Sequence, residues 1–199
     1  MFKRVLCTII LFMGLLYQPD MSDANTPVVK KGRDYYIAKY LQVFTNLTPA
    51  EVLTVIKVES DGNPNTISLE PNVNDKSYGP MCVLGKTARF MHFTGDLRQL
   101  CTWEHGLYYG MQFLSWKKAE ACKQARTARI RRRHTWSLYN AGRLELVKRD
   151  GTWTYINQRY VNICEKYYKN LKKYDSDVKY CIPVNVVWLD ENIANLGRD

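Results

Sequence analysis

The sequence has few of the side chains that bind metals. It contains three histidines and six cysteines in 199 residues, and no two cysteines stand in a C-x-x-C arrangement. Structural zinc sites need cysteines and histidines clustered at short spacings, and no such cluster exists. We therefore expect no metal site, and no motif in the sequence calls for a cofactor.

Long apolar runs are also missing. The N-terminal run at 5–17 has about 13 residues, fewer than the roughly 20 that a helix needs to cross a membrane. Lys3 and Arg4 precede it, and the small residues Ser22 and Ala24 follow it, which is the pattern of a secretory signal peptide. We expect residues 1–24 to be a signal cleaved after Ala24, and the protein to act in the periplasm or cell envelope. A retained N-terminal anchor is the alternative.

No internal repeat, low-complexity tract or long linker divides the rest of the chain. Without the signal about 175 residues remain, enough for one domain with its own core. Apolar residues recur at helical spacing at 34–44, 103–116 and 155–174, while Asp150 and Gly151 favour a hairpin turn within 145–153. We expect one mainly α domain with a small β region over 25–199, its core at 48–172, and a C-terminal tail at 175–199 with an edge strand at 178–189.

Acidic residues are scarce, 19 against 29 basic ones, which gives a net charge of +10. A basic protein favours an anionic partner. Basic residues concentrate at 126–133, as either a solvated helix face or a patch for phosphates and carboxylates of the wall or membrane surface. Nucleic acid is not expected as a partner, because the export signal disfavours it and the aromatic residues do not interleave with the arginines.

Removal of the signal leaves five cysteines: Cys82, Cys101, Cys122, Cys164 and Cys181. An oxidising compartment permits two disulfides and one remaining thiol, with no pairing favoured. In a reducing compartment all five would be ordinary thiols.

Residues 48–81 carry the strongest local pattern. Thr48, Pro49 and Glu51 predict a helix start with a capping box, and Gly62 predicts its end. Four residues, Val52, Val55, Ile56 and Glu59, fall at helical spacing on one face.

Glu59 therefore belongs to the inward face of the last helical turn. Burial disfavours a charged carboxylate, so the pKa of Glu59 should rise and suit it to act as a general acid. The ordinary alternative is a half-exposed glutamate paired with a lysine or arginine.

Five sequence elements then follow in a fixed order between 48 and 172. They are Glu59-Ser60 with Asn63-Pro64 and Ser68, then Ser77-Tyr78-Gly79-Pro80-Met81, Thr87-Ala88, Ser137-Leu138-Tyr139-Asn140-Ala141-Gly142, and Tyr160-Val161. Together they resemble the signature of the soluble lytic transglycosylases, which is specific as an ordered set although each element alone is weak. The chain departs from that signature at Pro80, where leucine is usual, and at Cys82, where glutamine is usual.

The resemblance implies a lysozyme-like fold and cleavage of the MurNAc–GlcNAc bond in peptidoglycan glycan strands. It implies that Glu59 first protonates the leaving oxygen and then acts as the base, so that a 1,6-anhydro ring closes without water. The substrate-binding residues that it implies are Ser60, Ser68, Tyr78, Met81, Tyr139, Asn140 and Tyr160. Tyr160 should lie near the acid on a long late helix.

Two other functions stay open. A hydrolytic muramidase on the same fold would use a second carboxylate, Asp75 or Glu70, to hold an attacking water. A wall-binding or assembly protein that has lost turnover is also compatible with Cys82 in place of glutamine. The reaction products distinguish the transglycosylase from the muramidase, because hydrolysis leaves reducing ends and transglycosylation leaves anhydro ends.

Overall fold

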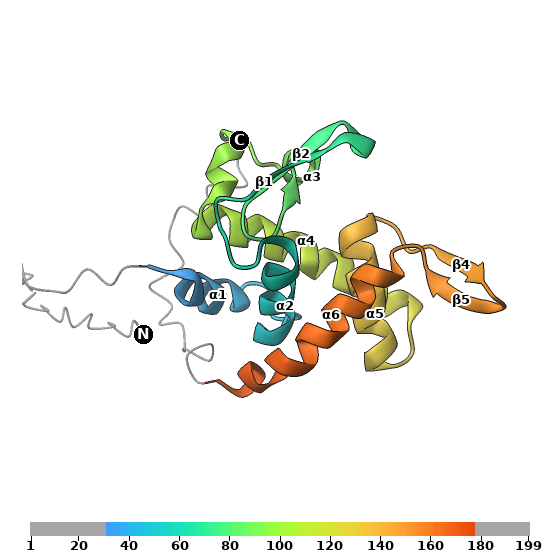
Figure 1. Ribbon diagram of the computed structural model, residues 1–199. Helices are drawn as coiled ribbons and strands as arrows, with labels where there is room; N and C mark the ends of the chain where they lie inside the picture. The colour runs from blue at the N-terminus through green and yellow to red at the C-terminus, as the bar shows by residue number, and fades with distance from the viewer. Residues whose placement is uncertain (1–30, 178–199) are drawn as a thin grey trace, which may run out of the picture. The chain divides into compact units, whose positions relative to one another are not determined.

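A computed structural model describes residues 31–177. In this part of the chain helices predominate over two small antiparallel sheets, which confirms the expected mainly α fold (Figure 1). The helices are α1 (Arg33–Leu41), α2 (Pro49–Ser60), α3 (Gly85–Phe90), α4 (Trp103–Gln124), α5 (Ala128–Ala141) and α6 (Gln158–Leu171). Single 3-10 turns lie at Pro71–Val73, Leu97–Cys101 and Lys172–Ser176. The expected signal at 1–24, the expected edge strand at 178–189 and Cys181 lie outside the described residues.

Helix α2 begins and ends as its sequence predicts. The backbone N–H of Thr48 donates to Glu51 Oε2 at 2.9 Å, and the N–H of Glu51 donates to Thr48 Oγ1 at 3.4 Å. Lys118 of α4 donates to the same Glu51 oxygen at 2.7 Å, so the capping box is tied to the neighbouring helix. The helix ends at Asp61, which takes the left-handed conformation that often stops a helix.

Helix α4 contacts α1, α5, the 3-10 turn at Leu97–Cys101 and strand β3 (Val83–Leu84). It continues eight residues beyond the expected end at 116, and the basic run at 126–133 follows it, in the connection to α5 and the first turns of α5. Leu107, Met111 and Leu114 of α4 are fully buried. A Cβ added to Gly110 would lie 2.6 Å from Met81 Cβ, so this glycine allows α4 to approach the segment that carries Met81.

The first sheet lies between α2 and α3 in sequence. Strand β1 (Ile67–Glu70) pairs with β2 (Asp75–Tyr78), which pairs with β3, in the order β1-β2-β3. Ser68 lies opposite Ser77, and Glu70 opposite Asp75. Because side chains alternate along a strand, these four residues belong to one face of the sheet.

The second sheet is the expected hairpin. Strand β4 (Leu146–Arg149) pairs with β5 (Thr152–Tyr155) through Asp150 and Gly151, whose φ angles are 48° and 76°. Positive φ at both central residues is the turn geometry that suits a two-residue hairpin. Helix α6 follows the hairpin and packs against α2 and α5 (Figure 1). Among residues 31–177 no helix is long and apolar enough to cross a membrane.

Candidate active site

Glu59 lies in the last turn of α2, half-buried, with its carboxyl against α6. The Tyr160 hydroxyl donates to Glu59 Oε1 at 2.5 Å, which confirms the expected position of Tyr160 near the acid. Burial raises the pKa of Glu59 to about 7; the Tyr160 hydrogen bond opposes this rise, and the charge of Glu70 adds to it. The predicted rise of the Glu59 pKa is therefore confirmed. A carboxyl group with a pKa near 7 can both donate and accept a proton at neutral pH.

Glu59 lines two cavities. The first has a volume of about 330 Å³, and its walls come from α2, the first sheet, α3, α4 and α5. Its lining includes Glu59, Glu70, Ser77, Cys82, Thr87, Phe113, Tyr139 and Asn140. The second has a volume of about 540 Å³ and is formed by α2, the end of α5, the β4–β5 hairpin and the start of α6. Its lining is Val58, Glu59, Asn140, Arg149, Ile156, Asn157, Gln158, Arg159, Tyr160 and Ile163. The cavities share only Glu59 and Asn140, so the site extends away from Glu59 in two directions.

The amide of Asn140 is held by a neighbour that the sequence did not single out. Asn157 Nδ2 donates to Asn140 Oδ1 at 3.0 Å and to the Ser137 carbonyl at 3.1 Å, while Ser137 Oγ donates to Asn157 Oδ1 at 2.8 Å. Since the Asn140 oxygen is already occupied, its N–H group is what remains to donate to a ligand.

Tyr139 fixes the backbone at the end of the motif Ser77-Tyr78-Gly79-Pro80-Met81. Its hydroxyl donates to the Met81 carbonyl at 2.6 Å, and burial raises its pKa well above the usual value. The Met81 side chain is fully buried and packs against Gly110, so Met81 faces the core. Tyr139 lines the first cavity as well, packed 5.2 Å from Phe113 between ring centres.

The predicted ligands Ser60, Ser68 and Tyr78 lie outside the linings of both cavities. Ser60 Oγ contacts the carbonyls of Ile56 at 3.1 Å and Pro80 at 2.8 Å, which ties the end of α2 to the loop before Met81. Tyr78 is half-buried against the core. Ser68 is exposed and lies opposite Ser77, which lines the first cavity. Their roles in substrate binding stay predictions.

The two candidate second carboxylates have different surroundings. Glu70 lines the first cavity with Glu59 and accepts a hydrogen bond from Ser77 Oγ at 3.0 Å. Asp75 Oδ2 instead accepts from the backbone N–H of Lys86 at 2.8 Å, in the first turn of α3. Only Glu70 is thus placed in a cavity with Glu59.

Cys82 occupies the cavity wall with a positive φ of 47°. Its thiol donates to the Glu59 carbonyl at 3.3 Å, and burial raises its pKa to about 12. Cys82, Cys101, Cys122 and Cys164 are all free. Two disulfides would need at least one pair among these four, so that arrangement is not found. Within 31–177 no three histidines, cysteines or carboxylates gather as metal ligands.

The basic run is only partly available for an anionic partner. Arg132 forms a two-point ion pair with Glu165 at 2.9 and 3.2 Å and lies 4.2 Å from the centre of the Tyr168 ring. Arg129 and Arg133 instead line a shallow hollow of about 420 Å³ with Lys166 and Lys169 of α6. Contact between this run and the wall or membrane surface stays a prediction.

Several lining residues were not among the predicted site residues. Ser77 could have been found from the hairpin register, since it must share a face with Ser68. Asn157, Arg149 and Arg159 belong to no motif. The β4–β5 hairpin brings Arg149 to the second cavity, and the start of α6 brings Asn157 and Arg159.

Comparisons with protein-family models, with curated proteins and with solved structures found no match to this chain.

Proposed function

We propose that this protein is a peptidoglycan lytic transglycosylase with Glu59 as its general acid and base. The observation that carries the proposal is the half-buried Glu59 carboxyl, which has a pKa of about 7 and lies where two cavities meet. The ordered motif residues around it agree with this function, because Glu59, Tyr139, Asn140 and Tyr160 gather at one site.

In the first step, protonated Glu59 gives its proton to the glycosidic oxygen as the bond to the anomeric carbon breaks. The Tyr160 hydroxyl then stabilises the carboxylate that forms, through the bond at 2.5 Å. In the second step, this carboxylate takes the proton of the sugar's own C6 hydroxyl, whose oxygen closes the 1,6-anhydro ring. Glu59 ends protonated, and no water is consumed.

Asn140 would position the sugar during both steps. It is shared by the two cavities, and its remaining N–H group can donate to a sugar hydroxyl or acetamido oxygen. Because Asn157 fixes the other half of the amide, little side-chain freedom is lost on binding.

A hydrolytic muramidase is the second candidate, and the position of Glu70 favours it. Glu70 lines the first cavity with Glu59, where a carboxylate could hold an attacking water. In that case the product would carry the atoms of one additional water molecule.

Digestion of purified peptidoglycan with mass analysis of the fragments tests the proposal. We expect anhydro-muramyl ends from the wild-type protein and no fragments from Glu59→Gln. Glu145→Gln is the matched control, because the Glu145 side chain pairs with exposed Arg143 and lines neither cavity. Fragments with reducing ends would contradict the transglycosylase assignment and support the muramidase. Normal biological activity of a Glu59→Gln protein that cuts nothing would instead support the wall-binding or assembly role.

A further inference from the structure

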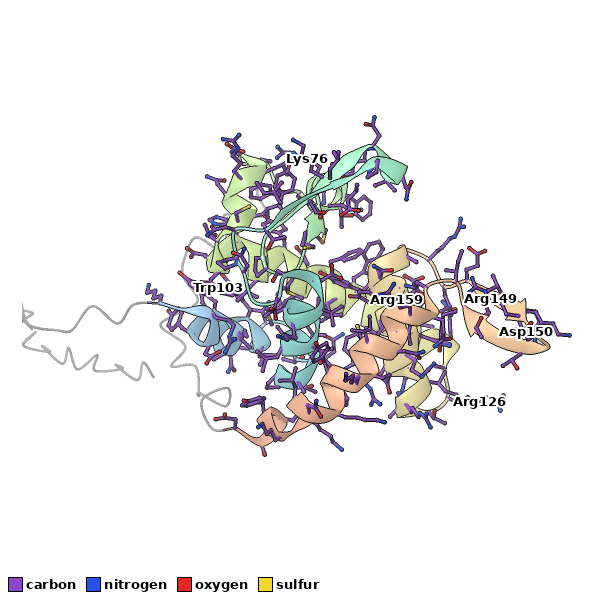
Figure 2. All side chains as sticks on the ribbon, viewed as in Figure 1. Lys76, Trp103, Arg126, Arg149, Asp150 and Arg159 are labelled. Atoms are coloured by element: carbon purple, nitrogen blue, oxygen red, sulfur yellow. The ribbon has the colours of Figure 1, made fainter. Side chains whose placement is uncertain are left out.

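The second cavity beside Glu59 carries two arginines from separate elements. Arg149 ends strand β4, and Arg159 lies in the first turn of α6 (Figure 2). Both side chains are exposed, and neither forms a hydrogen bond or ion pair with another residue of 31–177. Two unpaired guanidinium groups at one cavity form a site for an anion.

The remaining lining does not neutralise these charges. Glu59 is the only carboxyl group of this cavity, and its pKa of about 7 leaves it largely protonated below neutral pH. Asp150 follows Arg149 in the chain but is not part of the lining. The start of α6 adds positive partial charge of the same sign.

The first cavity has the opposite character. Its charged residues are Glu59 and Glu70, and no lysine or arginine lines it. Glu70 would repel an anion there, whereas the two arginines attract one on the other side of Glu59. The site therefore distinguishes its two directions by charge.

We propose that Arg149 and Arg159 bind a carboxylate on the side group of the muramyl sugar next to the bond that is cut. This proposal rests on the proposed function, since it names the part of the glycan strand that this cavity takes. The muramyl side group begins with a lactyl unit and continues into an acidic peptide, so it joins apolar carbon to carboxylates. Val58, Ile156 and Ile163 give the cavity apolar surface beside the arginines, which suits a group of that kind.

Binding of soluble muramyl fragments to the full-length Glu59→Gln protein, measured by calorimetry, tests the proposal without turnover. The probes are peptide-bearing disaccharides, the same fragments with their carboxylates amidated, and peptide-free fragments that keep the lactyl carboxylate. We expect amidation to weaken binding about tenfold to hundredfold, as for loss of a charge-assisted contact. The peptide-free fragment identifies the position, because its lactyl carboxylate is free only when no peptide is attached. Binding as tight as that of the intact fragment shows that the arginines accept a carboxylate at the lactyl position, and binding as weak as that of the amidated fragment assigns the carboxylates of the peptide.

Arg149→Gln/Arg159→Gln in the same background should weaken binding of the charged fragment by a similar factor and leave the amidated fragment unchanged. The matched control is Lys76→Gln/Arg98→Gln, which removes two exposed charges outside both cavities and should change nothing. Equal binding of charged and amidated fragments, or equal binding by the double variant and its control, overturns the proposal.

The two proposals fail in different ways. If the wild-type protein cuts peptidoglycan but charged and amidated fragments bind equally well, the proposed function stands and the carboxylate site is wrong. A protein that cuts nothing but shows charge-dependent binding through Arg149 and Arg159 keeps the site and loses the transglycosylase assignment.

Discussion

Tyr160 and Glu59 lie 101 residues apart in sequence and 2.5 Å apart between the phenol oxygen and Oε1. The hydroxyl donates to the carboxyl and lowers its pKa, while burial raises it more strongly, so the pKa stays near 7. This balance sets the pH range in which Glu59 can give and take a proton.

Tyr160→Phe should raise the pKa of Glu59, because the charged carboxylate loses a donor. The alkaline limb of the pH profile of kcat/KM should then move to higher pH, with lower activity overall. Tyr35→Phe, on α1 and outside both cavities, is the control and should leave the profile unchanged. A shift to lower pH would show that the hydroxyl does not stabilise the charged form.

Glu70→Gln separates transglycosylase from hydrolase. Loss of the Glu70 charge should lower the pKa of Glu59 and move the alkaline limb to lower pH, while anhydro products persist. Complete loss of cutting would point to Glu70 as the base for a water. Asp75→Asn is the matched control. It weakens the contact to Lys86, so it should lower stability and leave the product distribution unchanged.

Glu59→Gln should stabilise the protein, and more so at higher pH. The folded-state pKa of about 7 lies above the ordinary glutamate value of 4.5, so the folded form holds its proton more tightly. Its contribution is fully present below pH 4.5 and is lost as pH rises through about 7. The gap in unfolding free energy between variant and wild type should approach about 3 kcal/mol at pH 8 to 9 and nearly vanish near pH 4. Urea titrations at several pH values measure it, and a pH-independent gap would contradict the raised pKa.

Cys82 should resist alkylation although it lines the first cavity. Burial raises the pKa of its thiol to about 12, so the reactive thiolate is rare at pH 8. Exposed Cys122 supplies the internal comparison. Peptide mapping after brief iodoacetamide treatment should find Cys122 modified well before Cys82, and unfolding in urea should remove the difference. Equal rates in the folded protein would contradict the raised pKa of the Cys82 thiol.

Ser60→Ala should cost about 1–3 kcal/mol of stability, because the Pro80 carbonyl loses its donor. Unfolding by urea measures the loss. Ser68→Ala is the comparison: Ser68 is exposed, so stability should change little, while substrate affinity should fall if Ser68 binds substrate as predicted. If Ser60→Ala leaves stability unchanged but weakens substrate binding, Ser60 contacts the substrate instead of stabilising the fold.

Local sequence patterns predicted the parts of the fold that depend on neighbouring residues. The capping box of α2, the inward position of Glu59, the turn at Asp150 and Gly151, and the late helix with Tyr160 all follow from short-range spacing. Such features depend on backbone geometry within one or two turns, so the spacing of nearby residues is enough to predict them.

The parts that failed or were missed depend on distant contacts. The Met81 side chain enters the core because Gly110 of α4 leaves room for it, which no spacing near Met81 reveals. Asp75 could not be told from Glu70 until the strand register and α3 were known, since both fall on one face. Of the two arginines of the second cavity, Arg149 arrives on the β4–β5 hairpin, which no motif covers, and Arg159 on the first turn of α6.

The meeting of two cavities at Glu59 and Asn140 has a consequence for how a polymer would be cut. A long strand can occupy both sides at once, so neither terminus has to enter first. We therefore expect random scission, in which mean chain length falls early while small end fragments accumulate late.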